Sequence, residues 1–240
     1  MPFPKVVFLD LEGTLLKKNH QLDDGRVAPS AWTVLAKMLG EDCFREEELT
    51  KDKWLRGDYE GYLDWMKATV EIHRKYGLSE KTFNTLVKNA ALIPGTHEAV
   101  QYFKSMGAVT AIVTGGFKAL SNKAQTSLKI DHAFAGCEYF FSRDTGLIDH
   151  YNLLPADEQG KVGFMRLIAS EHGASPLECA FVGDGKNDVH LAKIVGFSVA
   201  FNAQEELKII ADRNIVQPAG KENWNAVIDT FKSQFHSNRN

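Results

Sequence analysis

Residues 6–14 of the 240-residue chain read Val6-Val7-Phe8-Leu9-Asp10-Leu11-Glu12-Gly13-Thr14, and this stretch decides the fold class. Its first four residues form a continuous apolar run rich in β-branched side chains. Such a run is typical of a strand buried on both faces of a parallel sheet. Two acidic residues and a glycine then end the run abruptly. The stretch therefore predicts a central strand whose carboxyl end carries polar side chains.

Two later runs have the same form. Residues 108–113 are apolar or β-branched and end at Thr114-Gly115-Gly116, and residues 179–182 end at Gly183-Asp184-Gly185. Because the carboxyl ends of strands gather along one edge of an α/β sheet, we expect the three polar endings to lie close together.

Helical patterns separate these strands. Strands that alternate with helices predict a doubly wound α/β domain with a mostly parallel sheet and a Rossmann-like core. The predicted helices cover about residues 96–106, 117–128 and 161–172, and a fourth begins near residue 187.

Residues 17–92 have a different pattern. They contain almost no β-branched runs but three helical stretches, at residues 29–39, 59–76 and 79–91, the last with Ser79 as its N-cap. We expect a helical cap domain at 17–92, inserted into an α/β core domain that comprises residues 1–16 and 93–240. Within the cap, the acidic run at residues 46–48 predicts a solvated helix face.

The overall composition is that of an ordinary globular protein. The net charge of −3 gives no reason to expect nucleic acid or an anionic membrane as a partner. No apolar run is long enough to span a bilayer and the start lacks signal-peptide architecture, so we expect a cytoplasmic protein. Cys43, Cys137 and Cys179 are odd in number and far apart, which predicts neither a disulfide framework nor a zinc site.

The first polar ending offers two carboxylates. Side chains two residues apart at the end of an extended strand point the same way, so Asp10 and Glu12 can share one site. One carboxylate can act as nucleophile while the other serves as general acid and base. Taken alone, an acidic turn after a strand is an equally good interpretation.

The second ending suits an anion. The Thr114 hydroxyl can donate to a phosphate oxygen, and Gly115 and Gly116 allow backbone amides to approach an anion at a helix N-terminus. Glycines in a strand-to-helix turn also have a purely conformational use, so this ending is a weak signal by itself.

The third ending supplies oxygen ligands. Asp184, Asn187 and Asp188 lie within five residues beside flanking glycines, and they suit a hard cation such as Mg²⁺. A dinucleotide fingerprint is disfavoured because Asp188 stands where the third glycine would be. Lys161 lies at the start of a predicted helix. It is a candidate site residue only in combination with the other three elements.

In this order, the four elements resemble the haloacid dehalogenase-like superfamily of phosphohydrolases, most closely its phosphoserine phosphatase-like branch. The family pattern is a strand ending D-x-D-[GS]-T, a strand ending in Ser or Thr, a lysine, and G-D-x-x-x-D. The chain has D-L-E-G-T, I-V-T-G-G-F, Lys161 and V-G-D-G-K-N-D. The resemblance implies a phosphatase that acts on a small phosphorylated metabolite with Mg²⁺ as cofactor.

The resemblance also implies a role for each matched residue. Asp10 would attack phosphorus and form an aspartyl-phosphate intermediate, and Glu12 would protonate the leaving oxygen and then activate water. Mg²⁺ would be held by Asp10, the backbone carbonyl of Glu12, Asp184 and Asp188. The phosphoryl group would be bound by Thr114, Gly115, Lys161 and Asn187.

The chain departs from the family pattern in two places. Glu12 stands where the family has aspartate, and a related branch that transfers phosphate to an acceptor alcohol also has glutamate there. A phosphotransferase is therefore one alternative, and a non-catalytic or receiver-like phosphate-binding protein is another. Asn19 or His20 and Met66 occupy the places of the cap glutamate and arginine that hold phosphoserine, so phosphoserine is not assigned as substrate.

Two expectations concern the cap and the assembly. The cap aromatic residues Trp54, Tyr59, Tyr62 and Trp65 could line a substrate pocket, although their helical spacing favours a packed cap core. We expect the protein to act as a monomer or homodimer.

Overall fold

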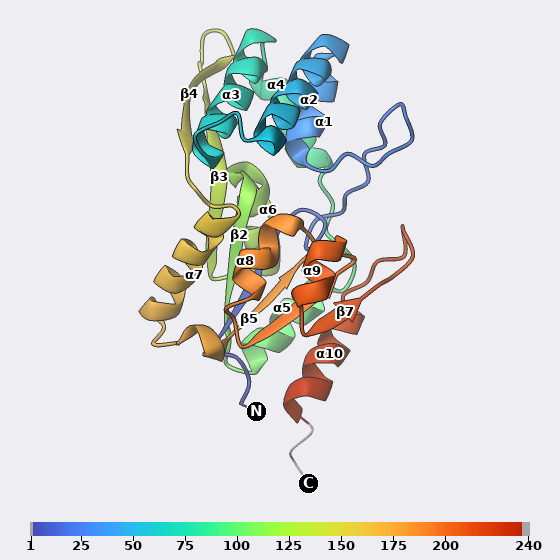
Figure 1. The fold of residues 1–240 in the computed structure, drawn as a ribbon, viewed down its shortest axis with the longest axis vertical. Helices are drawn as coiled ribbons and strands as arrows, with labels where there is room; N and C mark the ends of the chain where they lie inside the picture. Colours follow the sequence, from blue (N-terminus) through green and yellow to red (C-terminus); the bar gives the residue numbers. More distant parts are fainter. Residues whose placement is uncertain (1, 237–240) are drawn as a thin grey trace.

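The computed structural model describes residues 2–236, which form a seven-stranded sheet with helices on both faces (Figure 1). The strand order is β4-β3-β2-β1-β5-β6-β7, and every neighbouring pair is parallel except β3 and β4. The predicted doubly wound, mostly parallel α/β fold is thereby confirmed.

Strand β1 (Val6–Leu9) lies at the centre of the sheet, between β2 (Val109–Phe117) and β5 (Cys179–Gly183). Val6 aligns with Val109 on one side and with Cys179 on the other. All four β1 side chains are fully buried, as the continuous apolar run predicts. The three strands therefore bring their polar endings to one edge of the sheet.

The remaining strands extend the sheet on both sides. The hairpin of β3 and β4 was not predicted, because half of the β4 side chains are exposed, many in β3 are only partly buried, and the apolar run is interrupted. These strands are β3 (His132–Phe141), β4 (Ile148–Leu153), β6 (Phe197–Phe201) and β7 (Arg213–Ile215).

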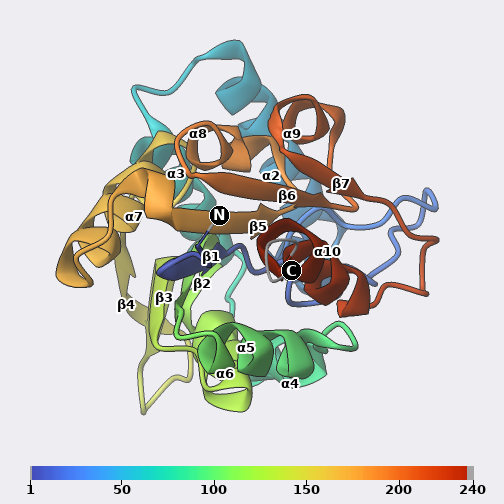
Figure 2. The same ribbon diagram turned by 90° about the horizontal axis from the view of Figure 1, so that it is seen from below.

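Helices cover the two faces of the sheet in two layers (Figure 2). Val7 and Leu9 face one layer, and Val6 and Phe8 face the other, so successive β1 side chains contribute to two separate cores. The first layer comprises α5 (Thr96–Ser105), α6 (Lys118–Leu128) and α10 (Asn225–His236). The second comprises α7 (Gln159–Glu171), α8 (Val189–Ala192) and α9 (Glu205–Ile210).

Four helices follow β1 and form a separate group, which we call the helical insertion (Figure 1). Ser79 accepts a hydrogen bond from the Thr82 amide at 3.3 Å, as predicted for the N-cap of the last helix. The second helix was not predicted as a separate element, although its acidic run was expected to be helical. The four helices are α1 (Ala31–Leu39), α2 (Glu41–Arg56), α3 (Tyr62–Lys75) and α4 (Glu80–Asn89).

Two boundaries differ from the prediction. β2 continues to Phe117, where a helix was expected to begin, so Gly115 and Gly116 belong to the strand and α6 begins at Lys118. The helix expected near residue 187 opens as a single turn of 3-10 helix at Lys186–Asp188. Gly115 and Gly116 therefore lie in extended strand, and Asp188 lies in the 3-10 turn.

Two findings concern the rest of the chain. The described helices include none with the length and apolar character needed to cross a bilayer. Cys43, Cys137 and Cys179 are buried free thiols.

Candidate active site

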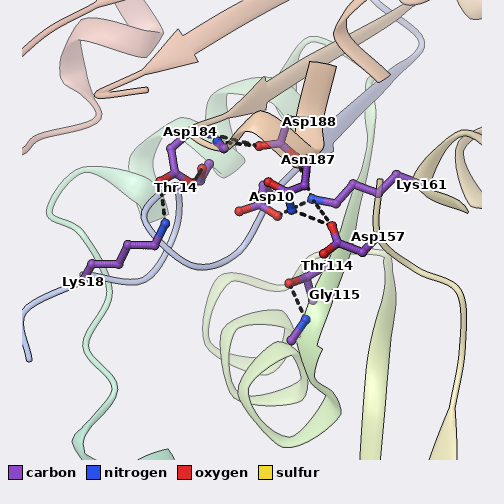
Figure 3. Close-up of polar contacts among 12 residues, drawn as sticks. Asp10, Thr14, Lys18, Thr114, Gly115, Asp157, Lys161, Asp184, Asn187 and Asp188 are labelled. Atoms are coloured by element: carbon purple, nitrogen blue, oxygen red, sulfur yellow. Dashed lines mark hydrogen bonds and ion pairs between the residues drawn. The ribbon is translucent and has the colours of Figure 1, made fainter. Parts of the chain in front are cut away.

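Three aspartates meet at the carboxyl ends of β1 and β5 (Figure 3). Asp10 follows β1 directly, and Asp184 and Asp188 follow β5. Carboxylate oxygens of the three residues all lie within 4.8 Å of one another, and all three residues are buried. Burial raises the pKa of Asp184 and of Asp188, and the negative charge of Asp10 adds to this effect. Buried carboxylates this close together repel one another unless positive charge lies nearby.

Lys161 supplies part of this charge from the first turn of α7. Its side chain is fully buried, and Nζ lies 2.6 Å from Asp10 Oδ1 and 2.6 Å from Asp188 Oδ1. Burial alone would lower the pKa of Lys161, but these carboxylates raise it well above its ordinary value of 10.5. The lysine is therefore held charged between the two aspartates.

Asp184 is held from the side of the β1 loop. Its Oδ1 accepts a 3.4 Å hydrogen bond from the Thr14 hydroxyl, and its Oδ2 lies 2.6 Å from Lys18 Nζ. Gly13 has a φ of +83°, and a Cβ at that position would lie 2.3 Å from Asp184 Oδ2. Only glycine therefore lets the loop pass so close to this carboxylate.

Glu12 links the sheet edge to the helical insertion. Its Oε2 accepts a 2.5 Å hydrogen bond from the amide of Ala31, the first residue of α1, where Ser30 makes no side-chain cap. Burial raises the pKa of Glu12 from 4.5 to about 7, although the Ala31 hydrogen bond opposes the rise. A Cβ on Gly116 would lie 2.5 Å from Glu12 Oε1, so the longer acid fits because this position is glycine.

The predicted anion-binding residues lie on the other side of Asp10. The Thr114 hydroxyl accepts a 3.1 Å hydrogen bond from the Gly116 amide. Asn187 Nδ2 donates to Asp157 Oδ1 at 2.5 Å, and Lys161 Nζ lies 3.8 Å from the same oxygen. Asp157 is therefore a third carboxylate beside Lys161, and the sequence patterns did not indicate it.

A cavity of about 280 Å³ opens over these residues, between the sheet edge and the helical insertion. Lys161 and Asp188 are fully buried below it, and Lys161 is joined to the cavity lining through its contact with Asp10. The predicted site residues that line the cavity are Asp10, Glu12, Thr114, Gly115, Asp184 and Asn187.

The cluster of Asp10, Asp184 and Asp188 fits a divalent cation. All of its ligand atoms are oxygens, which Mg²⁺ prefers, and the three carboxylates are close enough to share one ion. The only lysines in contact with the cluster are Lys18 and Lys161 among the described residues, which leaves the local charge negative. The residues therefore suit Mg²⁺.

Comparison with known proteins bears on this arrangement. The family model of haloacid dehalogenase-like hydrolases matches residues 4–196. The chain belongs to this family. The matched segment includes every predicted site residue, from Asp10 to Asp188.

Individual relatives of this haloacid dehalogenase-like hydrolase are phosphoserine phosphatases. The chain is 31% identical over 180 residues to that of Archaeoglobus fulgidus, covering 74% of this chain and 51% of the relative. It is 29% identical over 143 residues to a probable phosphoserine phosphatase of Schizosaccharomyces pombe, covering 60% of this chain and 48% of the relative. The match therefore spans about half the length of each relative.

The fold of this family member is also found in solved structures. The chain aligns with a phospho-aspartyl intermediate analogue of phosphoserine phosphatase at a TM-score of 0.74 and 22% identity, covering 95% of this chain and 99% of the other. The two chains thus share a fold along nearly their whole length.

The helical insertion contributes a buried acid to the cavity of this hydrolase-family chain. Glu47 lies in the acidic run for which a solvated face was predicted, but its side chain is only 4% exposed. The prediction was wrong for Glu47 because Cys43, Glu47 and Thr50 share the inward face of α2. Burial raises the pKa of Glu47 from 4.5 to about 7, and the neighbouring Glu48 adds to the rise.

We expect Glu47→Gln to change the pH dependence of stability. Because the pKa of Glu47 is higher in the folded state, its contribution to stability is lost as the pH rises from 4.5 through about 7. Between pH 5 and pH 8, the free energy of unfolding of the variant should therefore gain roughly 2 kcal/mol relative to the parent. Urea unfolding at the two pH values measures the difference.

Glu60→Gln, at an exposed position, is the matched control for this experiment. Its free energy of unfolding should differ from that of the parent by the same small amount at both pH values. A Glu47→Gln variant that behaves like this control would show that Glu47 ionises as an exposed acid does.

Proposed function

We propose that this protein is a Mg²⁺-dependent phosphatase that hydrolyses a small phosphomonoester through an aspartyl-phosphate on Asp10. The observation that carries the proposal is the buried group of Asp10, Lys161, Asp184 and Asp188 at the base of one cavity. The likeness to phosphoserine phosphatases supports the same reaction class. We also propose that residues 17–92 act as a cap domain over this cavity.

In the first half of the proposed reaction, Asp10 attacks phosphorus and the bond from phosphorus to the ester oxygen breaks. Lys161 Nζ binds Asp10 Oδ1, and within the described chain no hydrogen bond uses Oδ2. That oxygen is available as the nucleophile. Thr114, Gly115 and Asn187 line the same cavity, which supports their assignment to binding the phosphoryl oxygens.

In the second half, water attacks the aspartyl-phosphate and releases Asp10 and inorganic phosphate. Glu12 lines the same cavity and is the acid that protonates the leaving oxygen, then the base that takes a proton from water. Its hydrogen bond to the Ala31 amide orients the carboxyl group. The start of α1 thus takes part in positioning this acid.

Asp10, Asp184 and Asp188, with the Glu12 backbone carbonyl, are the groups that would hold Mg²⁺. When bound there, the ion would supply positive charge against the phosphoryl group and the aspartates. Lys161 offsets the charge of Asp10 and Asp188 from below, whether or not substrate is present.

Removal of divalent metal should abolish turnover. The test measures phosphate release from p-nitrophenyl phosphate and a panel of phosphorylated metabolites, with Mg²⁺ and with excess chelator. We expect release only with metal, because three carboxylates would otherwise face the substrate phosphate. Equal release with chelator would overturn the assignment of the metal. New phosphoesters formed with added alcohols would instead identify a phosphotransferase.

We expect Gly116→Ala to slow turnover. The new Cβ would lie 2.5 Å from Glu12 Oε1, so the carboxyl group must move away from its position beside the Ala31 amide. A misplacement of this size at a catalytic group lowers the rate by about 10²-fold. The measurement is kcat for p-nitrophenyl phosphate with saturating Mg²⁺.

Gly163→Ala is the control for this prediction, because a Cβ on Gly163 in α7 meets no atom within 4 Å. This variant should keep its activity and gain up to about 1 kcal/mol of stability, as expected for alanine in a helix. Normal activity in both variants would remove Glu12 from the mechanism.

A further inference from the structure

Four aromatic side chains of the helical insertion line the cavity that contains Asp10, and three of them stack on one another. We call these three the aromatic wall: Trp54, Tyr62 and Trp65. The planes of the two tryptophan rings are nearly parallel, at 4°, with centroids 5.2 Å apart. Tyr62 stands almost perpendicular to both rings, at 75° to Trp54 and 78° to Trp65. The arrangement presents both ring faces and ring edges.

The aromatic wall is not a closed core. Its three residues are only half-buried, whereas core rings such as Phe103 and Phe231 are fully buried. The prediction of a packed cap core is therefore incomplete, since these rings pack on one another and also border open space. Aromatic faces that border a desolvated cavity attract cations through the ring quadrupole.

A buried carboxylate lies in the lining of the same cavity. The two carboxylate oxygens of Glu47 accept hydrogen bonds only from the Thr33 hydroxyl, at 3.3 and 3.4 Å, within the described residues. No ion pair to Glu47 is formed in this part of the chain, because the neighbouring Lys51 pairs with Glu48 at 3.6 Å. A buried acid without a cation is unfavourable, and a positively charged ligand would relieve it.

The cavity lacks the group that would bind a substrate carboxylate. Of the residues described, no arginine lines it, and Arg56 is exposed and pairs with Asp58 at 3.0 Å. The cavity lysines Lys18 and Lys51 already pair with carboxylates, and Lys186 is exposed. A bidentate partner for a carboxylate is therefore missing, while an unpaired acid is present.

We propose that the cavity selects a phosphomonoester whose alcohol carries an alkylammonium group and no carboxylate, the cation being held by the aromatic wall and Glu47. This inference rests on the proposed phosphatase function and names its substrate class. An ammonium with methyl groups fits better than a primary one, because ring faces attract it without hydrogen bonds and, among the described residues, Glu47 is the one acid that the insertion contributes to the lining.

The test compares phosphocholine with 3,3-dimethylbutyl phosphate, which has the same shape but carbon in place of nitrogen. We expect kcat/KM to be at least about tenfold higher for phosphocholine, and higher also than for phosphoserine. Equal values for the isosteric pair would show that the pocket senses shape and not charge, which would overturn the inference.

Glu47→Gln identifies the group responsible. This variant should reduce the preference for phosphocholine over its neutral isostere. Glu46→Gln should keep it, because Glu46 is a half-buried acid that pairs with Lys75 and does not line the cavity. An unchanged preference in Glu47→Gln would exclude Glu47 as the group that recognises the cation.

Two further measurements separate this inference from the proposed function. Mg²⁺-dependent hydrolysis of p-nitrophenyl phosphate without any preference within the isosteric pair would contradict this inference but not the proposed phosphatase function. If no compound is hydrolysed, the proposed function fails. In that case, calorimetry measures the equilibrium binding of the two esters to Asp10→Asn. Equal affinities would contradict recognition of a cation by the cavity.

Discussion

Asp10→Asn should abolish turnover and leave the fold intact. The amide cannot form the aspartyl-phosphate, and loss of a nucleophile lowers kcat by at least about 10⁴-fold. Asparagine has nearly the same size as aspartate, and Lys161 keeps its ion pair with Asp188 at 2.6 Å. The measurements are phosphate release with Mg²⁺ and unfolding by urea.

Asp229→Asn is the matched control, because Asp229 is an exposed aspartate of α10. It should retain full activity and parental stability. If Asp10→Asn kept near-normal turnover, the nucleophile would have to be another group, and the proposed reaction would be wrong from its first step.

Lys161→Met should damage both activity and stability. Methionine has a similar length and fills the same buried space, but it leaves Asp10 and Asp188 without their shared cation. Removal of one member of a buried ion-pair network costs about 3–5 kcal/mol of stability. Since phosphoryl transfer depends on charge neutralisation, we also expect kcat/KM to fall by about 10³-fold.

Urea unfolding of Lys161→Met with and without Mg²⁺ distinguishes the two effects. A bound divalent cation should restore part of the lost stability, because it binds only the folded cluster. Lys193→Met, at an exposed position in the turn after α8, is the control and should unfold as the parent does. A Lys161→Met variant as stable as this control would show that the buried lysine does not offset the aspartates.

The central part of the fold could be predicted because its sequence signals are continuous. β1, β2 and β5 are buried on both faces and therefore appear as unbroken apolar runs. The residues that end these runs must occupy the carboxyl edge of the sheet. For this reason Asp10, Thr114 and Asp184 could be placed together from the sequence.

Other parts gave weaker signals for physical reasons. The β3–β4 hairpin is half exposed, and α2 is strongly charged with few buried side chains, so neither shows a clear apolar pattern. Lys18 and Asp157 lie in loops, so no helical or strand periodicity in the sequence indicates that they belong to the site. Their contacts with Asp184 and Lys161 arise only from tertiary structure.

The histidines illustrate the same limit. His132 and His172 meet with their Nε2 atoms 2.8 Å apart. Forty residues separate them, and they meet because the start of β3 lies beside the end of α7. Sequence spacing can reveal two histidines that lie on the same helix or strand. It cannot reveal two histidines that lie on different elements.

The central position of β1 has a consequence for synthesis of the protein. Val6 pairs with Val109 and with Cys179, so both neighbours of the first strand leave the ribosome long after it does. At about 5–20 residues per second, the second neighbour follows after roughly ten to thirty seconds. Both edges of this apolar strand are open until β2 is made, and one edge stays open until β5 is made. An open apolar edge is the kind of segment that chaperones bind and that aggregates when they are absent.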